Sequence, residues 1–358
     1  MWDFIVIGGG IAGTSVGARL SDLGRVLLLE REEALGYHAS GRSAALFEEN
    51  YGKPSTVALN RAGRSWFEEV GVLSPRGLML AGTEAERDAF EADCTAMKLT
   101  PIGPDEARAL WPILRPEVTL AAHDPDAWDI DTDRLIADFA ARIRAAGGAL
   151  RTRAEVRHIA KNGAAWRITT DERSEEARCL VNAAGAWVDQ VAHMAGIQPL
   201  GVTPLRRSMA RIPAPDGHDV SHWPMVFGPG EDWYAKPDAG ALIVSPAEED
   251  PQPPMDAWAD DMVLAEGLAR FEARVDIEVT RLLANWAGLR TFAPDRQLVL
   301  GPDPADRSFV WMAGQGGYGF QSAPAASRLV ADLVAGRPPE LDAAIVAQLR
   351  PDRFGARG

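Results

Sequence analysis

The stretch that decides the fold of this chain is FIVIGGGIAG, residues 4–13 of 358. Its first four residues are apolar and predict a buried parallel strand, and its glycines lead into a helix that we expect over residues 14–23. A second apolar strand, residues 26–29, ends on Glu30. A strand, a glycine turn, a helix, a second strand and an acidic residue in this order form the βαβ unit of dinucleotide-binding folds.

Each glycine of the turn has its own physical task. Gly8 permits the tight turn, Gly10 lets the backbone approach a pyrophosphate, and Gly13 lets the helix pack close to the strand. The helix N-terminus offers free N–H groups and a positive dipole end to the phosphates. Glu30 is placed to accept hydrogen bonds from ribose hydroxyls, so the sequence predicts a bound dinucleotide.

Composition indicates a globular protein that is long enough for two hydrophobic cores. Hydrophobic residues make up 46% of the chain and charged residues 25%, which is ordinary for globular proteins. The formal net charge of -14 argues against a nucleic-acid partner and against binding to an anionic membrane surface. No run of about twenty apolar residues occurs, so we expect no transmembrane segment.

The two cysteines, Cys94 and Cys179, lie far apart and in unlike contexts. They form no metal-ligand spacing, so we expect neither a metal site nor a disulfide framework. The first strand begins so close to Met1 that we expect no signal peptide, and a cytoplasmic location fits both observations.

The pattern of an apolar strand that enters a small-residue turn recurs at residues 179–187 and 309–319. Between them, residues 204–286 are richer in Pro and Trp and predict antiparallel strands around Tyr234 and residues 242–244. We therefore predict an α/β fold with two domains. A discontinuous nucleotide domain takes residues 1–75, 133–203 and 287–358, and an α+β substrate domain on an antiparallel sheet takes 76–132 and 204–286.

The chain resembles flavoproteins of the D-amino-acid oxidase (DAO) superfamily, and most of all the bacterial FAD-dependent D-arginine dehydrogenases. The resemblance runs through residues 29–32, 36–45, 129–133, 180–187, 204–208, 223–225, 234–240, 286–290 and 315–319. It implies a Rossmann-like FAD-binding domain of the DAO type. It also implies noncovalent FAD, because related sarcosine oxidases attach flavin through a cysteine near the counterpart of Arg290 and this chain has none there.

The resemblance assigns a set of residues to the cofactor. The turn around the pyrophosphate is formed by Gly8, Gly10, Ile11, Ala12 and Gly13, and the adenosine half is contacted by Glu30 and Arg31 at the ribose, Val156 at the adenine, and Ala184 and Gly185 beside the nucleotide. On the flavin half, Arg42, Ser43 and Ala44 lie along the ribityl chain and the ring edge. The pyrimidine end of the flavin is contacted by Gly316, Gly317, Tyr318, Gly319 and Phe320. A helix N-terminus at that end would stabilise the negative charge of reduced flavin.

The resemblance also implies a clamp for a substrate carboxylate. Arg290 matches an arginine that pairs bidentately with the carboxylate, a geometry that lysine cannot reproduce. Arg207 matches a second arginine, and we expect that one member of the Arg206–Arg207 pair faces solvent. Tyr234 matches a tyrosine that hydrogen-bonds the carboxylate, and Tyr51 matches one on an active-site loop.

The substrate pocket departs from the D-arginine dehydrogenase pattern. Leu46 replaces an active-site histidine, and Leu78 replaces the glutamate that receives the basic side chain of the substrate. Losing that carboxylate disfavours a cationic substrate, so a neutral or apolar D-amino acid is expected rather than D-arginine. Glu48 replaces a threonine and either restores the charge or faces solvent beside Glu49, and we favour the second interpretation. The remaining walls are expected to be Met225, Phe227 and Gly317.

The expected reaction is oxidative deamination of a D-amino acid, with hydride transfer from Cα to flavin N5 and hydrolysis of the imino acid to a 2-oxo acid and ammonia. The alternatives are oxidation of an N-methyl amino acid or of a 2-hydroxy acid. A nucleotide-binding protein without turnover is disfavoured, because it has no need of a carboxylate clamp. His38 is expected to be structural, and the electron acceptor, quinone or O2, stays open.

Overall fold

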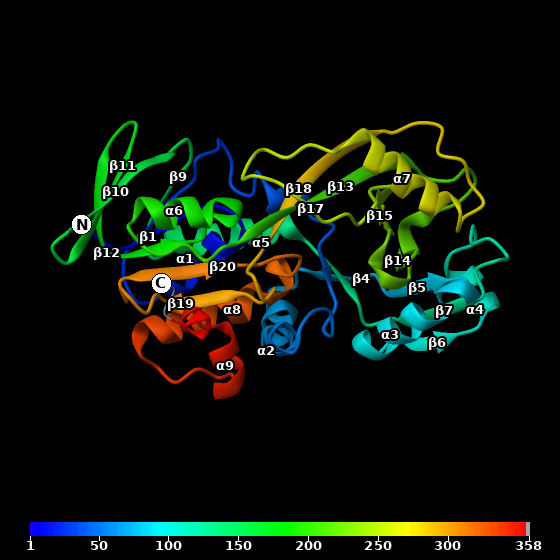
Figure 1. Cartoon of the computed structure of the whole chain (residues 1–358), viewed down its shortest axis with the longest axis horizontal. Helices are drawn as coiled ribbons and strands as arrows, with labels where there is room; N and C mark the ends of the chain where they lie inside the picture. Colours follow the sequence, from blue (N-terminus) through cyan, green and yellow to red (C-terminus); the bar gives the residue numbers. More distant parts are fainter. Residues whose placement is uncertain (356–358) are drawn as a thin grey trace.

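An eight-stranded sheet around the N-terminal strand organises one half of the molecule, whose computed structural model describes residues 1–355 (Figure 1). The strand order is β10–β11–β12–β1–β2–β9, with β20 paired to β12 and to β19. The strands are β1 (Trp2–Ile7), β2 (Val26–Leu29), β9 (Ala149–Arg151), β10 (Val156–Asn162), β11 (Ala165–Thr170), β12 (Ser174–Asn182), β19 (Val299–Pro302) and β20 (Phe309–Ala313).

The predicted βαβ unit is confirmed. Strands β1 and β2 are parallel, with Phe4 opposite Val26, and helix α1 (Ile11–Leu20) connects them. The helix begins at Ile11, earlier than expected, because Gly10 already occupies its N-cap position. Residues 156–162 form strand β10, which pairs with β11 and extends the antiparallel edge of the sheet.

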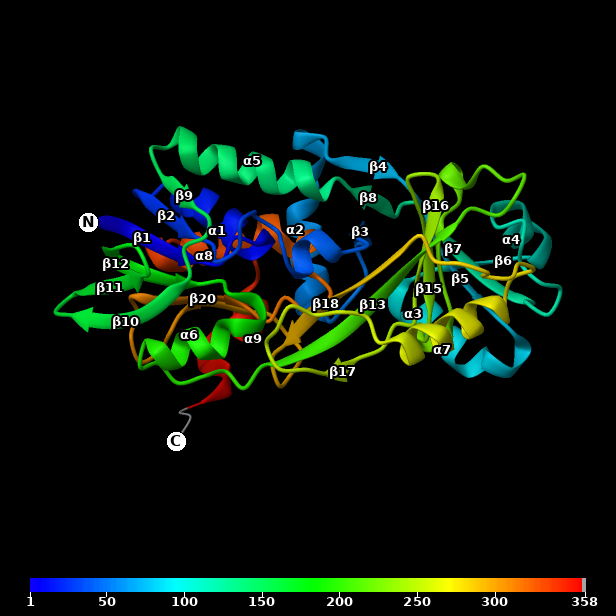
Figure 2. The same cartoon turned by 90° about the horizontal axis from the view of Figure 1, so that it is seen from above.

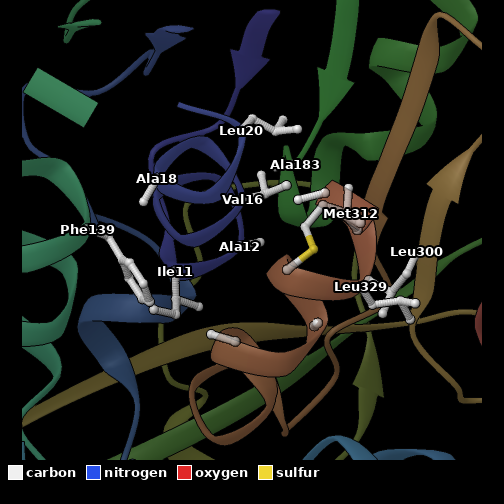
Figure 3. Close-up of a cluster of buried hydrophobic side chains, with 14 of the residues drawn as sticks. Ile11, Ala12, Val16, Ala18, Leu20, Phe139, Ala183, Leu300, Met312 and Leu329 are labelled. Atoms are coloured by element: carbon white, nitrogen blue, oxygen red, sulfur yellow. The ribbon is translucent and has the colours of Figure 1, made fainter. Parts of the chain in front are cut away.

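Helices cover both faces of this sheet. They are α1, α2 (Pro54–Val70), α5 (Thr132–Ala145), α6 (Val188–Met194), α8 (Gly319–Ala335) and α9 (Ala343–Leu349). Asp131 caps α5, since its side chain accepts a hydrogen bond from the Arg134 N–H. Figure 3 shows side chains of α1 meeting Met312 of β20 and Leu329 of α8 in one apolar cluster, with Phe139 of α5 on the other side of α1.

A nine-stranded, mainly antiparallel sheet organises the other half (Figure 2). Its order is β17–β13–β16–β15–β14–β5–β7–β6, with β18 paired to β13, and only β5 and β14 are described as a parallel pair within residues 1–355. Its strands are β5 (Leu78–Gly82), β6 (Thr100–Ile102), β7 (Leu120–Asp124), β13 (Thr203–Pro213), β14 (Met225–Phe227), β15 (Tyr234–Asp238), β16 (Ala241–Ser245), β17 (Asp250–Pro251) and β18 (Ala284–Phe292). Helices α3 (Arg87–Met97), α4 (Pro104–Leu110) and α7 (Asp261–Glu272) pack around it.

Two connections tie the halves together. The long strands β13 and β18 run from one half into the other and pair from Thr203–Phe292 to Arg211–Ala284 (Figure 2). A small sheet of β3 (Leu46–Phe47), β8 (Trp128–Ile130) and β4 (Leu73–Pro75) forms the second connection. Because β18 crosses the predicted boundary at residue 287, the division into two domains stays a prediction. Within residues 1–355, no helix is both long and apolar enough to cross a bilayer.

Candidate active site

A continuous cavity of about 340 Å³ runs from the glycine turn after β1 to the paired strands β13 and β18. It collects almost every residue that the sequence placed at the cofactor or the substrate. These are Gly8, Gly10, Ile11, Ala12, Glu30, Arg31, Arg42, Ser43, Ala44, Leu46, Glu48, Tyr51, Leu78, Val156, Ala184, Gly185, Arg207, Met225, Phe227, Tyr234, Arg290, Gly316, Gly317, Gly319 and Phe320. Gly13 and Tyr318 support the wall from behind and do not line the cavity.

The glycine turn has the close backbone contacts that its sequence predicts. A Cβ atom on Gly13 would lie 1.8 Å from the Gly8 carbonyl oxygen, so only glycine lets α1 begin this close to β1. Gly8 itself has φ of 110°, which favours glycine. The first backbone hydrogen bond of α1 runs from Thr14 N to Gly10 O, which leaves the earlier N–H group of Ala12, a cavity-lining residue, for a ligand.

Glu30 holds the glycine turn in place. One carboxylate oxygen accepts a hydrogen bond from Gly9 N at 2.6 Å, and the other accepts one from Glu32 N at 2.9 Å. The side chain is buried and still lines the cavity, so its remaining lone pairs are available to a ribose. The ribose contact itself stays a prediction.

A loop after β17 contributes to the cavity wall and is held by Arg42. The guanidinium donates to Ala257 O and Ala287 O, both at 2.9 Å, and pairs with Asp256 at 2.5 Å. Met255 and Ala257 of this loop line the cavity. His38 is hydrogen-bonded to Glu32 at 2.9 Å, in keeping with the structural role expected for it.

The two predicted arginines share one face of the β13–β18 pair. Arg207 stands opposite Gly288 and Arg290 stands opposite Leu205, so the guanidinium groups are diagonal neighbours and the glycine leaves room between them. Arg207 is 5% exposed, and its Nε and Nη1 have no hydrogen-bond partner among the described residues. Burial lowers the pKa of Arg207, and the like charge of Arg290 lowers it further.

Glu231 joins this site, and the sequence reasoning missed it. Its carboxylate accepts a hydrogen bond from the Tyr51 hydroxyl at 3.0 Å. Gly230 and Glu231 have φ of 74° and 55°, and this left-handed turn presents the carboxylate to the cavity. Burial works to lower the pKa of Arg290, but Tyr51, Tyr234 and Glu231 outweigh it and raise that pKa above its ordinary value. The Gly-Pro-Gly-Glu sequence at 228–231 is a turn signal, but nothing in it shows that the turn faces Tyr51.

The position of Arg206 contradicts the expectation that one arginine of the Arg206–Arg207 pair faces solvent. It is only 11% exposed and interacts with Asp250 at 2.8 Å, Glu248 at 3.7 Å and Asp260 at 3.8 Å, on the opposite face of β13 from Arg207. The prediction that one arginine of the pair faces solvent is therefore wrong. Alternation along the strand separates the two side chains, but both faces of β13 are covered here.

Apolar side chains form the rest of the substrate end of the cavity, namely Leu46, Leu78, Met97, Met209, Met225 and Phe227. Glu48 stands among them and is 2% exposed, so the interpretation that it faces solvent is wrong. Its neighbour Glu49 pairs instead with Arg61 and Arg64 at the surface. Burial, together with Asp124, raises the pKa of Glu48 to about 8.

These observations fit an extended, anionic dinucleotide. The free N–H group at the start of α1 suits a pyrophosphate, and a second helix N-terminus, that of α8 at Gly319, opens on the same cavity. The fold and the site together define a dinucleotide-binding oxidoreductase.

The chain belongs to the DAO family, described as FAD dependent oxidoreductase, which matches residues 3–333. FAD is accordingly its cofactor.

Known proteins similar to this chain are flavoenzymes of this family. Human mitochondrial dimethylglycine dehydrogenase is 24% identical to this chain over an alignment of 385 residues, gaps included. The alignment covers 98% of this chain but only 44% of that enzyme. This chain thus spans less than half the length of that relative. Glycine oxidase from Geobacillus kaustophilus is 24% identical over 359 residues, covering 93% of each chain. The crystal structure of L-proline dehydrogenase from P. horikoshii superposes with a TM-score of 0.83 at 23% identity over 98% of this chain and 97% of that one, which shows a shared fold.

Proposed function

We propose that this protein uses FAD to oxidise a D-α-amino acid with a neutral side chain. The observation that carries the proposal is the buried Arg207 guanidinium, whose Nε and Nη1 lack partners beside Arg290. Burying two like charges side by side with guanidinium donors left unpaired is unfavourable, so the site calls for an anionic ligand. A carboxylate matches the planar donors of arginine.

Tyr234 and Tyr51 differ in how easily their hydroxyl groups can donate a hydrogen bond to that carboxylate. Tyr234 donates its hydroxyl proton to the weak acceptor Met209 Sδ at 3.3 Å, so it can turn to a carboxylate oxygen at little cost. Tyr51 donates its single proton to Glu231, so it can donate to the substrate only after that bond breaks. Arginines and tyrosines together would fix the amino acid so that its Cα hydrogen faces the flavin. Bound FAD supplies the hydride acceptor at N5.

The part of the cavity that would receive the substrate side chain supports a neutral substrate at neutral pH. Leu46, Leu78 and Phe227 present no charge to the cavity, and Glu48 holds its proton at pH 7 because its pKa is raised to about 8. A guanidinium placed there would lose its hydration without gaining a carboxylate partner. This supports the expectation that D-arginine is a poor substrate at neutral pH.

Oxidation of an N-methyl amino acid is the second candidate. It is favoured by the similarity to dimethylglycine dehydrogenase over 98% of this chain. The same carboxylate clamp would hold either substrate, and the apolar walls leave room for N-methyl groups or for a side chain.

The test is anaerobic bleaching of the oxidised holoenzyme with a panel of D- and L-amino acids, sarcosine, dimethylglycine and 2-hydroxy acids. We expect neutral D-amino acids to bleach the flavin at pH 7 and their L-enantiomers not to. Bleaching by sarcosine or dimethylglycine alone would establish the second candidate instead. If neither group reduces the flavin, both proposals are wrong. Reoxidation of the reduced enzyme by O2 or by a soluble quinone then identifies the acceptor.

A further inference from the structure

Glu48 is a buried carboxyl group without a cationic partner among residues 1–355. Its Oε1 accepts a hydrogen bond from Asn50 N at 2.8 Å, whereas no basic or amide donor among residues 1–355 reaches the buried Oε2. The group opposite is a second acid, Asp124, at the end of β7. Strand β5 pairs Leu78 with Asp124 on one side and with Met225 on the other. The two carboxyl groups therefore meet beside the apolar wall of the substrate cavity.

A carboxyl group in this setting has two ways to be satisfied. It can hold a proton and remain neutral, or it can lose the proton and pair with a cation that enters the cavity. Only the first is open to the free protein, since the described residues place no Lys, Arg or His beside Glu48.

We propose that Glu48 is a proton-controlled specificity residue: protonated, it admits neutral side chains, and ionised, it binds a side chain that ends in a cationic amine. The inference rests on the proposed function, since it concerns the side chain of the same amino-acid substrate. On binding of the cationic substrate, the Glu48 proton leaves to solvent, its hydrogen bond with Asp124 is lost, and no covalent bond other than O–H changes.

The groups around Glu48 determine the pH range over which its carboxyl group ionises. From another element of the described structure, Asp124 is the titratable side chain that acts on Glu48, and it raises the pKa of Glu48. Gln321 of α8 and Asn60 of α2 contact its backbone and are uncharged, and Asn50 of its own loop favours the ionised form. Burial is the largest effect, and the pKa of Glu48 is raised to about 8. At pH 7 Glu48 is therefore mainly protonated.

The test compares D-lysine with D-norleucine, two substrates of similar length that differ in the terminal ammonium. The ratio of their kcat/KM values cancels titrations that both share, including that of the α-amine. The ratio should rise about tenfold per pH unit from pH 6 to pH 9, since it follows the proportion of ionised Glu48, which binds the ammonium, to protonated Glu48, which accepts the neutral side chain. A ratio that does not change with pH in the wild-type enzyme would overturn the inference.

Variants separate Glu48 from its neighbours. Glu48→Gln should make the ratio independent of pH, and Asp124→Asn should move the rise to lower pH. Glu49→Gln is the matched control, since Glu49 pairs with Arg61 and Arg64 at the surface, and it should leave the wild-type profile unchanged. A rise that persists in Glu48→Gln would assign the effect to another group.

Binding without turnover distinguishes failure of this inference from failure of the proposed function. The absorbance change of oxidised holoenzyme on binding 6-aminohexanoate or hexanoate reports affinity alone. The affinity ratio should follow the same pH profile. If it does while no amino acid bleaches the flavin, the proposed function fails and the role of Glu48 stands. If neutral D-amino acids bleach the flavin but the affinity ratio is flat, the role of Glu48 fails and the proposed function stands.

Discussion

Replacing Arg207 by Met should impair catalysis and leave the fold intact. The Arg207 guanidinium has no hydrogen-bond partner at Nε and Nη1, and its Nη2 is 3.5 Å from Glu249. A hydrogen bond to a charged group contributes about 1.5–3 kcal/mol, so loss of two such bonds to a substrate carboxylate should cost about 3 kcal/mol or more. That corresponds to at least about a hundredfold loss of kcat/KM.

The same substitution should not lower stability. Arg207 is a buried charge beside the like charge of Arg290, and an apolar side chain of similar length removes that repulsion and the desolvation cost. The thermal unfolding midpoint of the substrate-free holoenzyme, followed by tryptophan fluorescence, should therefore stay constant or rise. Steady-state kinetics with a neutral D-amino acid supplies the second measurement.

Arg206→Met is the matched control, because its side chain lies on the other face of β13 and does not line the cavity. It leaves the buried Glu248 without its cationic neighbour, and removing one member of a buried pair costs about 3–5 kcal/mol. We expect a lower unfolding midpoint and a nearly unchanged kcat/KM for the folded enzyme. The reasoning is refuted if Arg207→Met keeps its kcat/KM, or if it is the variant that unfolds early.

Three further predictions concern substitutions of residues around the cavity. Gly13→Ala, which places a Cβ 1.8 Å from Gly8 O, should cost about 1–3 kcal/mol and lower the flavin-to-protein absorbance ratio of the purified enzyme; full flavin content would contradict the close packing. Because the pKa of Glu48 is raised to about 8 from about 4.3 in the unfolded chain, this group should favour folding below pH 4.3 and lose that contribution as the pH rises to 8. Urea unfolding of Glu48→Gln should show a flatter pH profile across that window, and an unchanged slope would count against the burial effect. Asp256→Ala frees Arg42 from a partly exposed ion pair worth up to about 1 kcal/mol, so FAD should dissociate about fivefold faster by flavin fluorescence, and an unchanged rate would mean that the loop does not retain FAD.

Much of the fold could be predicted from local patterns. The β1–α1–β2 unit lies within residues 2–29, and its strand, glycine turn, helix and second strand follow one another directly, so its physical causes are visible in a short window of sequence. Gly13 was predictable for the same reason, since its constraint comes from Gly8 five residues earlier.

In the candidate site, too, local features were predictable and contacts between distant segments were not. The sequence by itself determined the nucleotide-binding unit and, through its resemblance to a family, which residue types gather at the cofactor and the carboxylate. Only the tertiary structure decided how Glu48, Arg206 and Glu231 are used. Glu48 meets Asp124, Arg206 meets Glu248 and Glu231 meets Tyr51, and each pair is separated by dozens of residues. Whether a charged side chain faces water or another charge depends on which distant segment covers it, and that is settled only when the two sheets pack together.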